Sequence, residues 1–154
     1  RIEKTDGEVL YKLSSVSEVN IFMTKKTSEM KYEILYRNGQ LISSYAKNVK
    51  DGVTEIVTML WQGSQYLIHK GDLVLKLSKP ITFSGIMLYF QEPVATTTIF
   101  SERMGEYTHF NKTGASEYQC KTPNGVNNIY RYSNGKLVEL ELSKGASVFM
   151  RLIQ

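Results

Sequence analysis

The stretch MKYEILYRNGQLISSYAK, residues 30–47, decides the fold class that the sequence predicts. In its first half, Tyr32, Ile34 and Tyr36 alternate with mostly charged residues, a period-two pattern typical of a half-buried β-strand. The dipeptide Asn38-Gly39 follows, and it favours a two-residue type I′ turn because both positions tolerate positive φ. The residues after the turn resume an extended pattern. The stretch therefore predicts an antiparallel β-hairpin.

The same turn chemistry recurs along the chain, at Asp6-Gly7, Asp51-Gly52, Asn124-Gly125 and Asn134-Gly135. Most of these dipeptides lie between runs of alternating apolar and polar residues, as the turns of an antiparallel sheet do. Residues 24–29, which include the pair Lys25-Lys26, are expected to form a turn. Strands are expected at 9–24, 30–37, 40–47, 53–61, 66–68, 73–77, 97–103, 106–112, 116–122, 126–132, 136–142 and 147–153.

Two strands differ in how their apolar residues are distributed. In residues 53–61, Val57, Met59 and Trp61 share one face while Ile56 and Leu60 share the other, so both faces are expected to need cover. In residues 136–142, Val138, Leu140 and Leu142 oppose Glu139 and Glu141, which indicates one packed face and one wet face. We therefore expect one all-β domain over residues 1–154. Its predicted architecture is a single antiparallel curved sheet or open β-barrel of about ten strands with one short helix.

The segment from Phe83 to Phe90 interrupts the alternation with an apolar run. Its composition predicts the short helix, capped by Thr82 or Ser84. Gly85 weakens a helix, so a buried strand is the alternative.

Composition excludes several function classes. The 154 residues are 42 % apolar and 22 % charged, as in an ordinary globular protein. The net charge of +4 is spread evenly along the chain, since the eleven basic and nine acidic residues up to Leu77 carry half of it. The basic residues form no stripe of the kind that binds nucleic acid. No apolar run approaches the roughly 18 residues of a membrane span.

The nucleophilic and metal-ligating residues are few. Cys120 is the single cysteine; it shares a face with Tyr118 in the predicted strand and is interpreted as a small buried hydrophobe. His69 and His109 are the two histidines, and no ligand spacing surrounds them. The chain lacks a nucleophile elbow, a phosphate loop and a dinucleotide fingerprint. We therefore expect no enzymatic activity, no catalytic residue, no metal and no cofactor.

Five motifs stand out in the second half of the chain: Lys79-Pro80-Ile81-Thr82-Phe83-Ser84, Leu88-Tyr89-Phe90-Gln91-Glu92-Pro93, Phe100-Ser101-Glu102-Arg103-Met104-Gly105-Glu106, Pro123-Asn124-Gly125 and Tyr132-Ser133-Asn134-Gly135. Together they resemble a family of small exported Bacteroidetes proteins of unknown function. The resemblance covers most of the chain after Glu29 and implies a periplasmic or secreted all-β domain, with a shape similar to the open, helix-plugged β-barrels of outer-membrane lipoprotein carriers. Because the chain begins in mid-pattern without Met, we expect it to be the remnant of a longer precursor whose signal peptide and first strand are absent.

The densest polar cluster is expected around the predicted helix and the turn at Met104-Gly105. Paired carboxylates can divide acid and base roles when their environments separate their pKa values, but nothing in the sequence indicates such a separation. We expect Arg103 to form a structural ion pair with one of the cluster's glutamates. The cluster comprises Glu92, Glu102, Arg103 and Glu106, with His109 beside them.

Aromatic and methionine side chains suggest a second candidate site. If the sheet curves, they line a concave apolar surface that suits a lipid or another apolar small molecule; alternatively they fill the core. The residues are Tyr32, Tyr36, Tyr45, Met59, Trp61, Met87, Tyr89, Phe90 and Tyr132.

Two function classes follow. The first is an exported, non-enzymatic structural or interaction module that meets a cell-envelope protein, and a solid core with an apolar surface patch would favour it. The alternative is a binding or carrier protein for an apolar or lipid-like ligand, and an exposed apolar lining would favour that.

Overall fold

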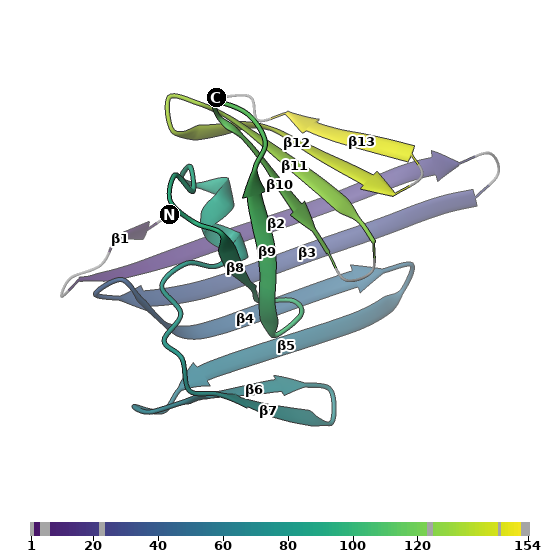
Figure 1. Ribbon diagram of the computed structural model, residues 1–154. Coiled ribbons are helices and arrows are strands. Elements are labelled where there is room, and N and C mark those ends of the chain that lie inside the picture. The colour runs from purple at the N-terminus through teal and green to yellow at the C-terminus, as the bar shows by residue number, and fades with distance from the viewer. Residues whose placement is uncertain (1, 4–6, 22–23, 123–124, 145, 152–154) are drawn as a thin grey trace. The chain divides into compact units, whose positions relative to one another are not determined.

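The computed structural model describes residues 2–3, 7–21, 24–122, 125–144 and 146–151 (Figure 1). These residues form two compact units. Residues 1–82 and 102–105 belong to the first unit, and residues 83–101 and 106–154 to the second. Each unit contains one antiparallel sheet, so the all-β prediction is confirmed at the level of fold class.

The first unit is a seven-stranded meander in which each strand pairs with the next along the chain, drawn from purple to teal in Figure 1. Strand β3 begins at Thr24, so the predicted turn at 24–29 is wrong, and the expected strand 9–24 ends at Ile21. The strands are β1 (Ile2–Glu3), β2 (Glu8–Ile21), β3 (Thr24–Arg37), β4 (Gln40–Lys50), β5 (Val53–Trp61), β6 (Tyr66–Lys70) and β7 (Leu73–Leu77).

The predicted type I′ turns are confirmed where the structure describes them. Asn38 and Gly39 have φ values of 50° and 77°, and they join β3 to β4 as a two-residue loop. Asp51-Gly52 and Asn134-Gly135 likewise have positive φ at both residues. Asp6 and Asn124 lie outside the described residues, so the two remaining dipeptides are not tested.

One face of the seven-stranded sheet is buried. Cross-strand pairing aligns Tyr11, Ile34, Ser44, Met59 and Ile68 in one row across β2 to β6. All five are buried. The four apolar members lie on the side of their strands that period-two alternation indicates, and Ser44 is a buried polar residue among them.

The opposite face differs from the expectation that both faces of β5 need cover. Leu60 is 52 % exposed and Ile56 is also exposed, whereas Val57 and Met59 on the buried face are almost inaccessible. The apolar residues on both sides of this strand therefore do not indicate two buried faces.

The second unit is a six-stranded meander, drawn in green to yellow in Figure 1. Its strands are β8 (Thr98–Ser101), β9 (Glu106–Lys112), β10 (Glu117–Lys121), β11 (Asn127–Ser133), β12 (Lys136–Lys144) and β13 (Ala146–Arg151). Two sheets thus replace the single sheet or barrel of about ten strands that we predicted. In neither sheet are the two outermost described strands paired with each other, so neither closes into a barrel.

The predicted helix is a single 3₁₀ turn, η1 (Gly85–Tyr89). Ser84 occupies the N-cap position in an extended conformation, and its side chain makes no capping hydrogen bond. A bridge between Ser84 and Phe100 holds the backbone extended immediately before the turn, which leaves no room for a longer helix at this end. Leu88 of η1 packs into the core of the six-stranded sheet.

The packed face of β12 also differs from the simple alternation. Leu137 is 2 % exposed, whereas Val138 is 36 % exposed. A β-bulge between Arg131 and Tyr132 pairs Tyr132 with Leu137, so Leu137 takes the core position that we assigned to Val138. Beyond the bulge Leu140 is buried, as predicted.

Candidate functional site

Four residues of the predicted apolar surface lie on the buried face of the first unit. Tyr32 and Tyr36 are on β3, and Met59 and Trp61 are on β5; the strand register places all four on one side of the sheet. Tyr45 pairs with Glu33 and Thr58 on the opposite side, so its assignment to this surface is wrong. Tyr36 and Met59 are buried.

A polar group adjoins these aromatic residues. The Tyr32 hydroxyl donates a hydrogen bond of 2.9 Å to Asn48 Oδ1. Asn48 is 7 % exposed, and its Nδ2 has no hydrogen-bond partner; Ser44 Oγ, on the same face of β4, has none either. Burial raises the pKa of the Tyr32 phenol, while the hydrogen bond to Asn48 opposes that shift. Tyr32 is therefore a neutral donor at physiological pH and not a base.

Arg103 lies at the same end of the sheet, but its partner is not one of the predicted glutamates. Arg103 Nε donates to Glu55 Oε2 at 3.2 Å, and Lys70 Nζ lies 3.6 Å from Glu55 Oε1. All three side chains are partly exposed, so these ion pairs contribute little stability. Sequence reasoning missed Glu55 because it is 48 residues from Arg103.

An open hollow of about 1010 Å³ surrounds this end of the sheet. Its lining includes Asn48, Glu55 and Arg103, together with Thr58 and His69. Thr58 pairs with His69 in one row, whereas Asn48 pairs with Glu55 in a row on the other face. The hollow therefore wraps around the end of the strands and is not an enclosed binding cavity.

The other residues of the predicted polar cluster have different surroundings. Glu102 and Arg103 lie in the turn after β8, not in a strand as we expected, and Glu102 is buried. Glu92 accepts a hydrogen bond of 2.9 Å from the Tyr118 hydroxyl in the second unit. Glu106 is exposed at the start of β9. Glu92 is thus bound to a tyrosine and Glu106 faces solvent, so these two carboxylates do not form a pair for acid–base catalysis.

The remaining apolar candidates surround η1 in the second unit. Met87 is buried, and Tyr89 packs against the core cluster that contains Tyr132. The Tyr132 hydroxyl donates to the Leu88 carbonyl at 2.8 Å and so fixes η1 to the sheet. Phe90 is half-buried at the end of the turn, where its N–H bonds the Met87 carbonyl.

Cys120 belongs to the same core cluster, next to Tyr118 on one face of β10, as predicted. Burial raises the pKa of its thiol to about 11, so the thiolate, which is the nucleophilic form, is rare at neutral pH. In the described part of the chain, no three His, Cys, Asp or Glu side chains are grouped as a metal site requires.

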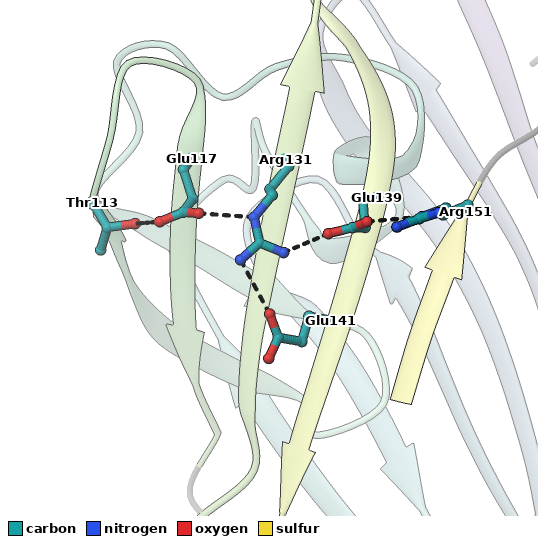
Figure 2. Close-up of polar contacts among 6 residues, drawn as sticks. All are labelled: Thr113, Glu117, Arg131, Glu139, Glu141 and Arg151. Atoms are coloured by element: carbon teal, nitrogen blue, oxygen red, sulfur yellow. Dashed lines mark hydrogen bonds and ion pairs between the residues drawn. The ribbon is translucent and has the colours of Figure 1, made fainter. Parts of the chain in front are cut away.

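The densest polar network lies on the outward face of the second unit and was not predicted (Figure 2). Arg131 Nε, Nη1 and Nη2 donate to Glu117, Glu139 and Glu141 at 2.9, 2.6 and 3.1 Å. Arg151 Nε donates to the second oxygen of Glu139 at 3.0 Å. The glutamate partners raise the pKa of Arg131. Hydrogen bonds from Thr113 and then Arg131 lower the pKa of the Glu117 carboxyl, and hydrogen bonds from Arg151 and then Arg131 lower that of Glu139.

The network follows from strand register. Glu117, Arg131, Glu139 and Arg151 are direct cross-strand neighbours on β10 to β13, so their charges alternate along one row. Opposite charges directly across a strand pair are stabilising. Because every nitrogen of Arg131 already has a glutamate partner, the network is better suited to tying the strands together than to binding a ligand. The alternating charges were visible in the sequence, but their alignment depends on the bulge.

Comparisons with known proteins give a family without a function. A model of a domain of unknown function, DUF6134, matches residues 1–153. No curated protein and no solved structure was found to match the chain. In the residues that the structure describes, no helix has the length and apolar character needed to cross a membrane.

Proposed function

We propose that this chain, which belongs to the DUF6134 family of domains of unknown function, is an exported, non-enzymatic interaction module of the cell envelope. The compartment is supported by the resemblance to exported proteins. The absence of enzymatic activity is supported by the local chemistry: Tyr32 is a buried neutral phenol, Cys120 is a protonated core thiol, and Arg103 is paired with Glu55.

The observation that carries the proposal is a leucine-rich row on the outward face of the first unit. Cross-strand pairing aligns Leu10, Leu35, Ser43, Leu60 and Leu67 across β2 to β6. Leu60 is 52 % exposed, and the other four are half-buried. Exposed apolar side chains that gather on one face of a protein are typical of an interaction site.

The buried face of the same sheet supports an interaction module over a carrier. Ile34, Val57 and Ile68 are almost inaccessible there, whereas a carrier needs an apolar lining that its ligand can reach. The exposed apolar area thus lies outside the core, on the face that carries Leu60.

Photocrosslinking in intact host cells tests this proposal. A benzophenone amino acid at Leu60 should give a covalent protein adduct, while the same group at Lys121, which is exposed on β10 of the second unit, should not. Adding Ile56→Lys, on the same outward face, should suppress the adduct at Leu60. No adduct at Leu60, or an equal yield at Lys121, would contradict an interaction through this face.

A carrier for an apolar or lipid-like ligand remains a second candidate because of two buried polar atoms. Asn48 Nδ2 and Ser44 Oγ lack partners on the buried face of the sheet, and a ligand head group with an acceptor atom would satisfy them. Native mass spectrometry of the protein purified from its own host should reveal a retained small molecule if this function holds. A homogeneous apo mass would contradict it.

A further inference from the structure

Strand β7 is an edge of the seven-stranded sheet, and none of the strands that the structure describes pairs with its outer side. It pairs with β6 on one side, and the meander ends there. An edge strand presents a row of free N–H and C=O groups that can pair with another chain. Among the described residues, no backbone hydrogen bond reaches β7 from its outer side.

The register identifies which residues carry the free groups. The two-residue turn at Gly71 and Asp72 closes on the pair Lys70–Leu73, which is therefore hydrogen-bonded. Hydrogen-bonded and non-hydrogen-bonded pairs alternate along an antiparallel ladder. The N–H and C=O groups of Leu73, Leu75 and Leu77 therefore point toward β6, and those of Val74 and Lys76 point outward.

The side chains of this edge are unusually apolar. Leu73 and Val74 are 53 % and 52 % exposed, and Leu75 and Leu77 are half-buried. Protein edges are normally protected by charges, proline or bulges. Lys76 is the single charged side chain within β7, so this edge is suited to forming further strand pairs.

We propose that β7 pairs antiparallel with β7 of a second copy of this chain, about a two-fold axis at Leu75. In this register Val74 and Lys76 of each copy exchange backbone hydrogen bonds with Lys76 and Val74 of the other. Leu75 faces Leu75 of the second copy, and Leu73 faces Leu77. The sequence Leu-Val-Leu-Lys-Leu is symmetric in its leucines about this centre, so each leucine contacts a leucine.

Charge and overlap favour this register over its neighbours. Moving the axis to Lys76 would place the two Lys76 side chains directly opposite, which is destabilising. Moving it to Val74 would leave Leu77 opposite Gly71 without an apolar partner. In the Leu75 register, each Lys76 faces Val74 of the second copy, so the two Lys76 side chains are diagonal neighbours and not directly opposite, and Asp72 of the second copy lies on the other diagonal of each lysine.

The inference goes beyond the proposed function, because it concerns the edge strand β7 and a second copy of this chain, and not the outward face that carries Leu60. Analytical ultracentrifugation of the 154-residue chain tests it. The native chain should dimerise, and Val74→Pro should raise the dimer dissociation constant about tenfold or more, because proline removes an outward N–H from each copy while the ladder to β6 stays intact. Val74→Thr retains the N–H and should still dimerise. A monomeric native chain, or a dimer unaffected by Val74→Pro, would overturn the inference.

Disulfide trapping tests the register and does not depend on the folding of the proline variant. Residues opposite each other in a non-hydrogen-bonded pair are about 4.5 Å apart at Cα, within disulfide range, and diagonal residues are about 7–8 Å apart. Leu75→Cys should therefore form a covalent dimer under mild oxidation, and Val74→Cys should not. The unmodified chain, with its buried Cys120, is the background control. Trapping by Val74→Cys, or none by Leu75→Cys, would overturn the pairing.

Leu60→Lys separates this inference from the proposed function. Leu60 lies on the outward face and not at the sheet edge, so this variant should dimerise like the native chain. Loss of the dimer in Leu60→Lys but not in Val74→Pro would overturn the edge pairing while supporting interaction through the outward face. A native chain that is monomeric but still gives the Leu60 photoadduct would likewise overturn the edge pairing and support the proposed function.

Discussion

Tyr66 shows how one side chain fixes the chain after the last strand of the first unit. Its fully buried hydroxyl donates to the Leu41 carbonyl at 2.8 Å and accepts from the Ile81 N–H at 3.1 Å. The Leu41 N–H in turn donates to the Ile81 carbonyl at 2.9 Å. The segment after β7 is thereby hydrogen-bonded to β4.

Tyr66→Phe should lower the free energy of unfolding by about 1–3 kcal/mol, because it leaves a buried N–H and a buried carbonyl without this partner. Urea denaturation followed by circular dichroism measures the change. Tyr45→Phe, on the outward face, is the control and should be nearly neutral. A neutral Tyr66→Phe would mean that other groups satisfy these atoms.

Gly39→Val should destabilise the fold by about 1 kcal/mol or more. Gly39 has a φ of 77°, a region that a β-branched residue adopts poorly, and a Cβ there would meet no atom within 4 Å. The cost is therefore backbone strain and not a clash. Thermal unfolding of Gly39→Val is compared with that of Gly39→Asn, because asparagine tolerates positive φ and should avoid the backbone strain. Equal melting temperatures for the two variants would argue against strain at this turn.

Leu140→Ala should cost about 2–5 kcal/mol, because Leu140 is buried in the core of the second unit. Val138→Ala on the same strand should cost much less, since the bulge leaves Val138 more exposed. Chemical denaturation of both variants measures the difference. Equal costs would mean that the alternation continues through the bulge. The sequence also predicts Val148, on the neighbouring strand, as a core residue. Its side chain lies outside those that the structure describes, and its backbone pairs with Leu142.

At the scale of elements, the Arg131 network predicts a dependence of stability on acid pH. Glu117 and Glu139 have folded-state pKa values below the usual 4.5. Because a depressed carboxyl pKa stabilises the fold above the unfolded-state pKa, this stabilisation is lost as the pH falls through the folded-state values.

Arg131→Gln should therefore melt below the native chain at neutral pH, and the gap should narrow as the pH falls from about 4.5 toward the folded-state pKa values. Differential scanning calorimetry across this range measures the gap. Lys121→Gln, at an exposed position of β10, is the control and should show no such trend. A gap that stays constant with pH would mean that the two carboxyls are not coupled to Arg131.

Elements with local determinants were predictable from the sequence. Asx-Gly turns depend on two adjacent residues, and the three that the structure describes in full formed as expected. The bulge at Arg131 and the 3₁₀ turn at η1 depend on pairing and packing with distant residues, so alternation alone could not locate them. The exposed Leu60 shows the same limit, because an apolar residue in a strand does not reveal whether its face is covered.

At the scale of the whole molecule, local alternation does not determine how many sheets the strands form. A meander of hairpins has the same pattern whether it continues in one sheet or is interrupted after β7, as it is here. The candidate sites were limited by the same non-local information. Alternation within a strand places Tyr32 with Tyr36, and Met59 with Trp61, on one face of their strands, whereas the pairing of Arg103 with Glu55 required a contact between distant segments.

Whether the core is filled is testable around Leu88 of η1. Leu88 is fully buried in a cluster with Phe110, Tyr130 and Leu140, and close-packed cores do not accept added volume. The native chain should bind no apolar fluorescent probe stoichiometrically, and Leu88→Trp should lower stability by about 1–3 kcal/mol through overpacking. Fluorescence titration and urea denaturation give the two readouts, with Val94→Trp at an exposed position as control. Stoichiometric probe uptake that Leu88→Trp abolishes without loss of stability would instead indicate a ligand cavity. A tryptophan that fills an existing void displaces the probe without overpacking the core.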